Sequence, residues 1–260
     1  MNTISSRLHL ERAVPHPPTW LLYRGRRWLR AFVEQRYGVR LHGTANVPAE
    51  GPVIFAANHL GVLDGPILAA FAPRPAHIVT KAEMFVGPLG TLLRAAGQIP
   101  LDRFHYDPAA VKACVRALSE GHAVGIFPEG IRGDGELRTV RPGAAYLAMV
   151  TGAPVVPVAF FGTRDPGSAR SAVPASGAVI DVVFGEPLAV NRVRWPRTRL
   201  QVEHNRAVLH AHLLRQLDEA KHLTGRSLPG PPRRPRHRRA SGGVRADAGQ
   251  LGGAVPQSRA

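Results

Sequence analysis

A histidine and an aspartate stand five residues apart, at His59 and Asp64, directly after an apolar run over residues 53–57. An imidazole that a carboxylate orients is a general base, able to take a proton from a hydroxyl near neutral pH. A pair at this spacing also arises by chance, and a surface histidine bonded to a helix-capping aspartate is the structural alternative. The pair becomes informative because two further polar blocks follow it along the chain.

Each of the two further blocks places an arginine after a glycine-marked turn. Arg103 follows Gly97, and Arg132 follows Glu129 and Gly130. A guanidinium matches a phosphate group with two parallel hydrogen bonds, so these arginines are candidate phosphate ligands. The alternative for either arginine alone is a solvated surface charge, and for Glu129 it is a structural ion pair.

The sequence offers no covalent nucleophile for this chemistry. The single cysteine, Cys114, falls in the middle of a predicted helix, and the chain contains no Gly-x-Ser-x-Gly turn. One cysteine also excludes an internal disulfide and any metal site built on cysteine pairs, which suits a reducing cytosol. We therefore expect a reaction without a covalent enzyme intermediate and without a metal ion.

Apolar runs alternate with helix signals along the chain. Strands are predicted at residues 53–57, 76–80, 123–127, 155–161 and 179–184, and helices at 87–96, 108–120, 141–151, 198–223 and from Asp64 onward. This alternation predicts an α/β fold with a largely parallel sheet and helices on both faces. Such folds bind ligands at the carboxyl ends of their strands, which is where His59 lies.

The net charge of +16 is concentrated at the two ends of the chain. Residues 1–40 hold 8 arginines against 2 glutamates and residues 225–260 hold 8 arginines against 1 aspartate, which leaves +3 for residues 41–224. We expect a basic N-terminal segment, a central domain over 41–224, and a disordered tail rich in arginine, proline and glycine over 225–260. The nearly neutral centre and the sparse aromatic residues argue against nucleic acid as a partner.

Residues 20–37 predict an amphipathic helix. Leu21, Trp28 and Phe32 share one face, while arginines occupy much of the remainder. This pattern suits the interface of an anionic membrane, where each arginine contributes about 1 kcal/mol near the surface. The alternative is a helix docked on the central domain with its arginines in water. No transmembrane helix or signal peptide is predicted, so we expect the protein at the cytoplasmic face of the membrane.

The ordered blocks resemble those of the glycerolipid acyltransferase family. They fall at residues 59–64, 97–103, 129–132 and 155–158, and the resemblance spans about residues 40–190. It implies a glycerol-3-phosphate acyltransferase-like fold in which His59 is the catalytic base and Asp64 orients it. The residues implied for binding the phosphate of the acceptor are Arg103, Arg132, Glu129 and Gly130, with Lys81 as a secondary member.

The resemblance also implies a reaction. A fatty acyl group passes from acyl-CoA or acyl-carrier protein to the free hydroxyl of lysophosphatidic acid and gives phosphatidic acid, with no further cofactor. Three residues depart from the pattern of the family: Gly61 and Gly133 stand where serine is common, and Ile131 stands where threonine is usual. Small hydroxyl groups near the phosphate help to fix the headgroup, so another lysolipid or a glycolipid remains open as the acceptor.

Two alternatives of other classes stay open at this point. A non-enzymatic module could use the basic ends to bind anionic lipid or nucleic acid, but the ordered blocks would then be coincidental. A hydrolase could use the histidine–aspartate pair on an ester or a phosphate. Phosphatase chemistry usually needs a metal cluster or a covalent nucleophile, and neither pattern is present.

Overall fold

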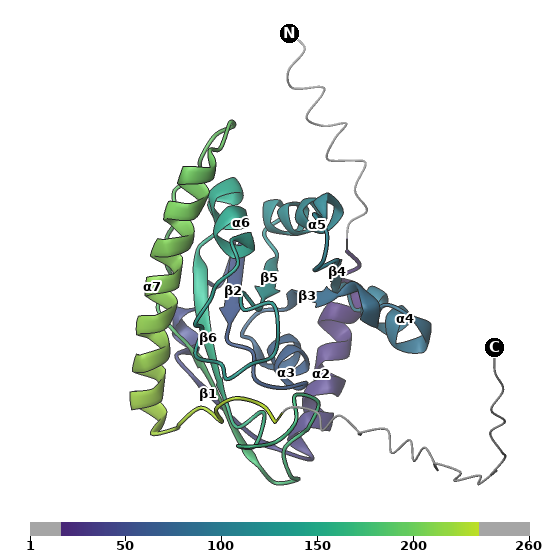
Figure 1. Ribbon diagram of the computed structural model, residues 1–260. Helices are drawn as coiled ribbons and strands as arrows, with labels where there is room; N and C mark the ends of the chain where they lie inside the picture. The colour runs from purple at the N-terminus through teal and green to yellow at the C-terminus, as the bar shows by residue number, and fades with distance from the viewer. Residues whose placement is uncertain (1–16, 234–260) are drawn as a thin grey trace, which may run out of the picture.

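A computed structural model describes residues 17–233, so the expectations for residues 1–16 and 234–260 lie outside the described part. Within it, one seven-stranded sheet has the order β1-β7-β6-β2-β5-β3-β4. Figure 1 labels its strands except β7, together with the helices around them. The strands are β1 (Gly38–His42), β2 (Val53–Ala57), β3 (Ala76–Lys81), β4 (Ile99–Leu101), β5 (Ala123–Ile126), β6 (Val155–Phe161) and β7 (Val179–Phe184). The helices are α2 (Trp20–Glu34), α3 (Asp64–Phe71), α4 (Gly87–Ala95), α5 (Pro108–Ser119), α6 (Gly143–Thr151) and α7 (Arg199–Thr224), with short 3-10 turns η1 (Thr44–Asn46) and η2 (Ala82–Met84).

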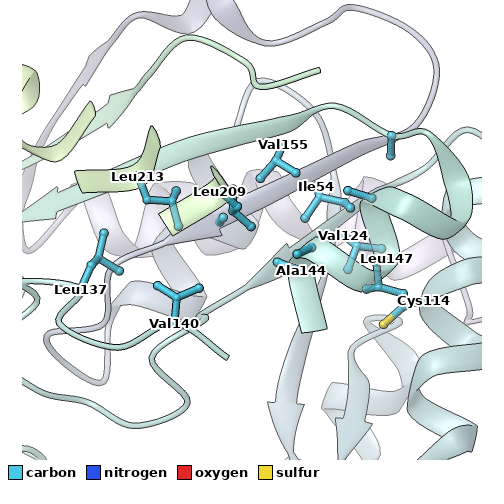
Figure 2. Close-up of a cluster of buried hydrophobic side chains, with 14 of the residues drawn as sticks. Ile54, Cys114, Val124, Leu137, Val140, Ala144, Leu147, Val155, Leu209 and Leu213 are labelled. Carbon is cyan, nitrogen blue, oxygen red and sulfur yellow. The ribbon is translucent and has the colours of Figure 1, made fainter. Parts of the chain in front are cut away.

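The central strands are apolar throughout because helices cover the sheet on both sides. All five residues of β2 are buried, and they point alternately to the two faces. Ile54 and Ala56 join the core beneath α5, α6 and α7. Figure 2 shows Ile54 in this core. Val53 and Phe55 join the second core, which α2 and α3 cover. The predicted α/β fold with helices on both faces is confirmed.

The direction of the strands decides where loop residues meet. Strands β6, β2, β5, β3 and β4 run parallel to one another, while β7 is antiparallel to β6. The loops that follow these five parallel strands therefore leave the sheet at one edge. Lys81 is the last residue of β3, and His59, Arg103, Glu129 and Arg132 lie in the loops that follow β2, β4 and β5.

The edge strands are the elements that local sequence patterns did not predict. Strand β1 is half-exposed and pairs with β7 along its whole length, from Gly38 with Val179 to His42 with Val183. It therefore includes residues on both sides of the expected boundary between positions 40 and 41. Strand β4 has three residues and pairs with β3. Pairing across the sheet creates both strands, because neither has a continuous apolar run of its own.

Helix α2 docks on the domain by one face and exposes the other. Leu22 and Val33 are buried, and Arg26 donates hydrogen bonds to the carbonyls of Ala70 and Ala72 at the end of α3. On the opposite side Trp28 and Phe32 are 79% and 63% exposed, together with Trp20. The docked interpretation thus holds for the buried face of the helix, and contact with a membrane stays a prediction for the exposed face. Over residues 17–233, no helix combines the length and the apolar character that crossing a membrane requires.

The structure corrects the expected disorder from position 225 onward for residues 225–233, which we call the C-terminal strap. Arg226 donates to the buried Asp181 (2.9 Å) and to the carbonyl of Val179 (2.9 Å). Leu228 packs against both hydrophobic cores. A segment whose apolar side chains are Leu228 and three prolines is held because an ion pair and hydrogen bonds to backbone carbonyls supply the other contacts, which composition does not reveal.

Candidate active site

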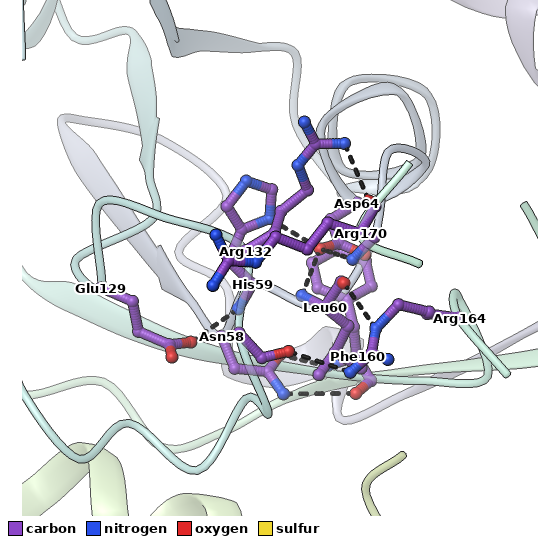
Figure 3. Close-up of polar contacts among 11 residues, drawn as sticks. Asn58, His59, Leu60, Asp64, Glu129, Arg132, Phe160, Arg164 and Arg170 are labelled. Carbon is purple, nitrogen blue, oxygen red and sulfur yellow. Dashed lines mark hydrogen bonds and ion pairs between the residues drawn. The ribbon is translucent and has the colours of Figure 1, made fainter. Parts of the chain in front are cut away.

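His59 and Asp64 meet across a short turn between β2 and α3. The turn spans residues 58–63, which we call the histidine turn, and Asp64 is the first residue of α3. Nδ1 of His59 lies 2.7 Å from Oδ2 of Asp64, whose side chain is fully buried (Figure 3). The predicted pair is therefore formed as a direct hydrogen bond, with the aspartate shielded from water.

Asp64 also organises the backbone of the histidine turn. Its Oδ2 accepts hydrogen bonds from the N–H groups of Leu60 (2.7 Å) and Gly61 (2.9 Å) in addition to the imidazole. Three donors that converge on one oxygen fix the orientation of the Asp64 carboxylate. The imidazole of His59 consequently has one orientation relative to the turn that carries it.

The far side of the imidazole is open. The His59 side chain is 20% exposed, and its ring stacks on Phe127 with centroids 4.2 Å apart. Within residues 17–233, Nε2 of His59 makes no hydrogen bond. An imidazole oriented through Nδ1 and free at Nε2 can accept a proton from a substrate hydroxyl.

Asn58 anchors the start of the turn to the neighbouring strand. Its buried side chain accepts a hydrogen bond from the N–H of Phe160 (2.8 Å) and donates one to the carbonyl of Phe160 (3.3 Å). The side-chain amide of Asn58 thus continues the hydrogen bonding between β2 and β6 beyond the end of β2. This bond holds His59 at the carboxyl edge of the sheet.

Glu129 accepts a hydrogen bond from the backbone of His59, and the structural ion pair that was its alternative interpretation is not formed within residues 17–233. Its Oε1 accepts a hydrogen bond from the N–H of His59 (2.8 Å), and the N–H of Gly133 donates to the carbonyl of His59 (2.8 Å). Burial raises the pKa of Glu129 to about 7, although the bond from His59 opposes the rise. The backbone N–H and the carbonyl of His59 are therefore both bonded by residues 129–133, which we call the Glu129 loop.

Arg103 follows β4, which lies two strands from β5 in the sheet, and its side chain reaches the same loop. It donates to the carbonyl of Gly130 (3.3 Å) and to Oε1 of Glu83 (3.1 Å). Gly130 has a φ of +74°, and a Cβ there would lie 2.5 Å from Nε of Arg141, so both conformation and space require glycine. The structure thus links Arg103 through Gly130 to the loop that holds His59.

The other two candidate cations, Arg132 and Lys81, lie at the same edge of the sheet. Among the described residues, neither side chain bonds to the Glu129 loop as Arg103 does. Arg132 donates to the carbonyl of Arg170 (3.0 Å), in the loop after β6. Lys81 ends β3 opposite Leu101, and its ammonium makes no hydrogen bond to the described part of the chain. Sequence patterns missed Glu83 as the partner of Arg103, and they also missed Arg164. The only sequence signal for Arg164 is its place after a predicted parallel strand.

Cys114 is placed as the sequence predicted, on α5 and away from the histidine turn. It is buried, and burial raises the pKa of its thiol to about 12. A thiol that remains protonated at neutral pH does not act as a nucleophile. This agrees with the expectation of a reaction without a cysteine nucleophile, and His59 stays the predicted base.

We expect the substitution Glu129→Gln to change how stability depends on pH. The raised pKa of Glu129 favours the folded state below about pH 4.5, and this contribution is lost as the pH rises through 7. Glutamine keeps an oxygen acceptor for His59 without the charge, so the variant should gain about 3 kcal/mol relative to wild type between pH 4.5 and pH 8. Urea unfolding at both pH values measures this, with Glu50→Gln at an exposed glutamate as the baseline. Parallel pH curves for the variant and wild type would contradict the assignment.

Comparison with known proteins places this site in a family. Residues 38–161 match the family model described as Acyltransferase. A 1-acyl-sn-glycerol-3-phosphate acyltransferase of Bacillus subtilis is 31% identical over 162 residues, which make up 62% of this chain and 78% of that protein. A chloroplastic 1-acyl-sn-glycerol-3-phosphate acyltransferase of Arabidopsis thaliana is 32% identical over 143 residues, which are 52% of this chain and 39% of the relative.

A solved structure shares the fold. The crystal structure of the 1-acyl-sn-glycerophosphate acyltransferase from Thermotoga maritima matches with a TM-score of 0.59 at 22% identity, over 78% of this chain and 80% of that one. The mostly parallel sheet, together with the family match, defines an α/β acyltransferase. The chain belongs to the acyltransferase family, as an O-acyltransferase of the group that includes the Bacillus enzyme.

Proposed function

We propose that this acyltransferase moves a fatty acyl group from the thioester of acyl-CoA or acyl-carrier protein to the free hydroxyl of lysophosphatidic acid, giving phosphatidic acid. The observation that carries the proposal is the 2.7 Å bond between His59 Nδ1 and Asp64, with Nε2 open to substrate. The Bacillus and Arabidopsis relatives, both named 1-acyl-sn-glycerol-3-phosphate acyltransferases, support the same acceptor.

The proposed reaction needs one base and no covalent enzyme intermediate. Nε2 of His59 takes the proton from the acceptor hydroxyl as its oxygen attacks the thioester carbonyl. A tetrahedral oxyanion forms and collapses, the carbon–sulfur bond breaks, and the imidazolium returns its proton to the departing thiolate. General-base assistance of this kind typically contributes about 10²–10⁴-fold, and positioning and stabilisation of the oxyanion supply the remainder.

The proposed phosphate site lies next to this base at the carboxyl edge of the sheet. Arg103 and Arg132 supply guanidinium groups, Lys81 supplies a further positive charge, and Gly130 shapes the turn between them. Glu129 suits an anionic substrate because its raised pKa of about 7 lowers its negative charge near neutral pH. A lysolipid or glycolipid with another headgroup is the alternative acceptor, since Gly61, Ile131 and Gly133 lack the hydroxyl groups common in the family.

The test is thiol release from long-chain acyl-CoA and from acyl-carrier protein, with lysophosphatidic acid present or omitted. The proposal expects release that depends on the acceptor, with phosphatidic acid as the product and little transfer to monoacylglycerol, which lacks the phosphate. Release without any acceptor would indicate a thioester hydrolase. Transfer to another lysolipid but not to lysophosphatidic acid would overturn the acceptor and leave the family unchanged.

The exposed face of α2 supports a further part of the proposal, contact with an anionic membrane at its cytoplasmic face. Trp28 and Phe32 project from this face beside the exposed Arg24. Aromatic side chains insert at the headgroup level and arginines attract anionic lipid. Replacing Trp28 and Phe32 with alanine should lower co-sedimentation with phosphatidylglycerol vesicles at least several-fold. Trp195→Ala, at a tryptophan that is also 79% exposed, is the control, and equal losses in both variants would refute this role for α2.

A further inference from the structure

Arg164 is a buried cation that no step of the proposed reaction uses. It follows β6 and is only 1% exposed, and none of the ion pairs among residues 17–233 includes it. Burial lowers the pKa of Arg164, opposed by the negative charges of Asp64 and Asp134, but a guanidinium stays charged in proteins. A buried charge without a carboxylate partner is costly unless hydrogen bonds satisfy its donors.

Backbone carbonyls satisfy the Arg164 guanidinium, and they come from four segments of the chain. Nε donates to the carbonyl of Leu60 in the histidine turn (3.0 Å). Nη2 donates to the carbonyl of Gly133 in the Glu129 loop (3.0 Å) and to that of Gly230 in the C-terminal strap (2.5 Å). Nη1 donates to the carbonyl of Ser168 (3.4 Å). One side chain therefore joins both loops that hold His59 to the loop after β6 and to the strap.

The contact with Leu60 leads directly to the catalytic carboxylate. The peptide group between Leu60 and Gly61 accepts a hydrogen bond from Arg164 at its oxygen and donates one to Asp64 Oδ2 (2.9 Å) at its nitrogen (Figure 3). This peptide dipole lies between a cation and an anion, with each end facing the opposite charge. Hydrogen bonds linked in this way strengthen one another, so loss of the guanidinium weakens the hold on Asp64.

The close approach of the histidine turn to the segment before Arg164 explains why glycine occupies position 61. A Cβ on Gly61 would lie 2.5 Å from the carbonyl oxygen of Thr163, the residue before Arg164. The histidine turn and the segment that carries Arg164 are thus packed backbone against backbone. A side chain at position 61 would push the turn away from the guanidinium.

We propose that Arg164 is a positioning residue for the acyl transfer, which holds His59 and Asp64 in place through the peptide group of residues 60 and 61, and that the C-terminal strap completes this support through Gly230. The inference deepens the proposed function and rests on the role of His59 as the base. It assigns a function to residues 225–233, whose composition predicts only a disordered tail.

The central experiment compares Arg164→Ala with Arg74→Ala. Arg74 is a matched control because it also joins loops through backbone carbonyls, those of Pro48 (3.2 Å), Gly51 (2.7 Å) and Gly121 (2.8 Å). These loops precede β2 and β5, so Arg74 lies at the edge of the sheet opposite His59. We expect Arg164→Ala to lower kcat about 100-fold with KM changed less than about threefold, because misplacing a catalytic group by about 1 Å has an effect of this size. Arg74→Ala should lower stability with kcat within about threefold.

Chemical rescue separates positioning from general loss of structure. Millimolar guanidinium should restore kcat in Arg164→Ala by at least fivefold and leave Arg74→Ala unchanged. Arg164→Lys keeps the charge, but its ammonium has three donors and cannot bond all four carbonyls, so its kcat should lie between those of wild type and the alanine variant. If all the variants lost activity only in proportion to their stability, the positioning role would be refuted.

The strap is tested by two truncations of the full chain. A chain that ends at Arg233 should retain wild-type kcat, while one that ends at Ser227 loses Gly230 and should lose at least fivefold. Equal activity of the two truncated chains would overturn the part assigned to the strap.

A readout without turnover keeps this test independent of the acceptor. The NMR signal of the proton between His59 Nδ1 and Asp64 should shift or broaden in Arg164→Ala and stay in place in Arg74→Ala. If wild type fails to acylate lysophosphatidic acid, the proposed function fails, yet this signal still tests Arg164. An unchanged signal in Arg164→Ala would refute the proposal even in an active enzyme.

Discussion

Replacing His59 with alanine should lower kcat for acyl transfer by about 10²–10⁴-fold, the range typical of general-base assistance. The fold should survive, because the buried Asp64 keeps two of its three donors, the N–H groups of Leu60 and Gly61. Thiol release with acceptor present measures the loss, and circular dichroism with thermal unfolding checks the fold.

A second histidine–aspartate pair provides the control for this prediction. His42 Nε2 on the edge strand β1 lies 2.9 Å from Asp181 on the neighbouring strand β7, away from the carboxyl edge that holds His59. His42→Ala removes the same type of hydrogen bond from a buried aspartate, so it should cost stability and leave kcat nearly unchanged. Retained transfer by folded His59→Ala would show that another group is the base.

The double variant Arg103→Gln, Arg132→Gln should have the second-largest effect, on kcat/KM with a phosphate-bearing acceptor. A hydrogen bond to a charged group is worth about 1.5–3 kcal/mol, so each arginine should contribute about 10- to 100-fold, and both together about 10²–10⁴-fold. Glutamine retains a hydrogen-bond donor and removes the charge. Initial rates over a range of lysophosphatidic acid concentrations give the effect, which should appear mainly in KM.

The acceptor itself discriminates between a phosphate clamp and a structural role for the two arginines. The slow transfer to monoacylglycerol, which has no phosphate, should change little in the double variant. Arg138→Gln is the matched single control, since Arg138 is exposed and pairs with Asp134 close to the same loop. Equal losses with both acceptors would indicate that Arg103 and Arg132 support the loops rather than bind phosphate.

Features that are formed by residues close together in the chain could be predicted from the sequence. Strands β2 and β6 agree with the predicted residues 53–57 and 155–161, because apolar runs buried on both faces have one interpretation in an α/β fold. The hydrogen bond of His59 to Asp64 was also predictable. A turn of six residues between a strand and a helix places both side chains within reach, whatever surrounds them.

Contacts between distant parts of the chain were decided by the tertiary structure. Glu129 bonds a backbone N–H 70 residues away, and Arg164 reaches Leu60 across 104 residues. Their partners are backbone groups, which every residue carries, so the sequence holds no pattern that marks them. The same reason explains β1, β4 and residues 225–233, which are ordered by pairing with or packing on elements far along the chain. The sequence by itself determined the α/β elements and the local pair that can start the chemistry. The packing of five parallel strands, whose loops leave at one edge, decided which loops hold that pair in place.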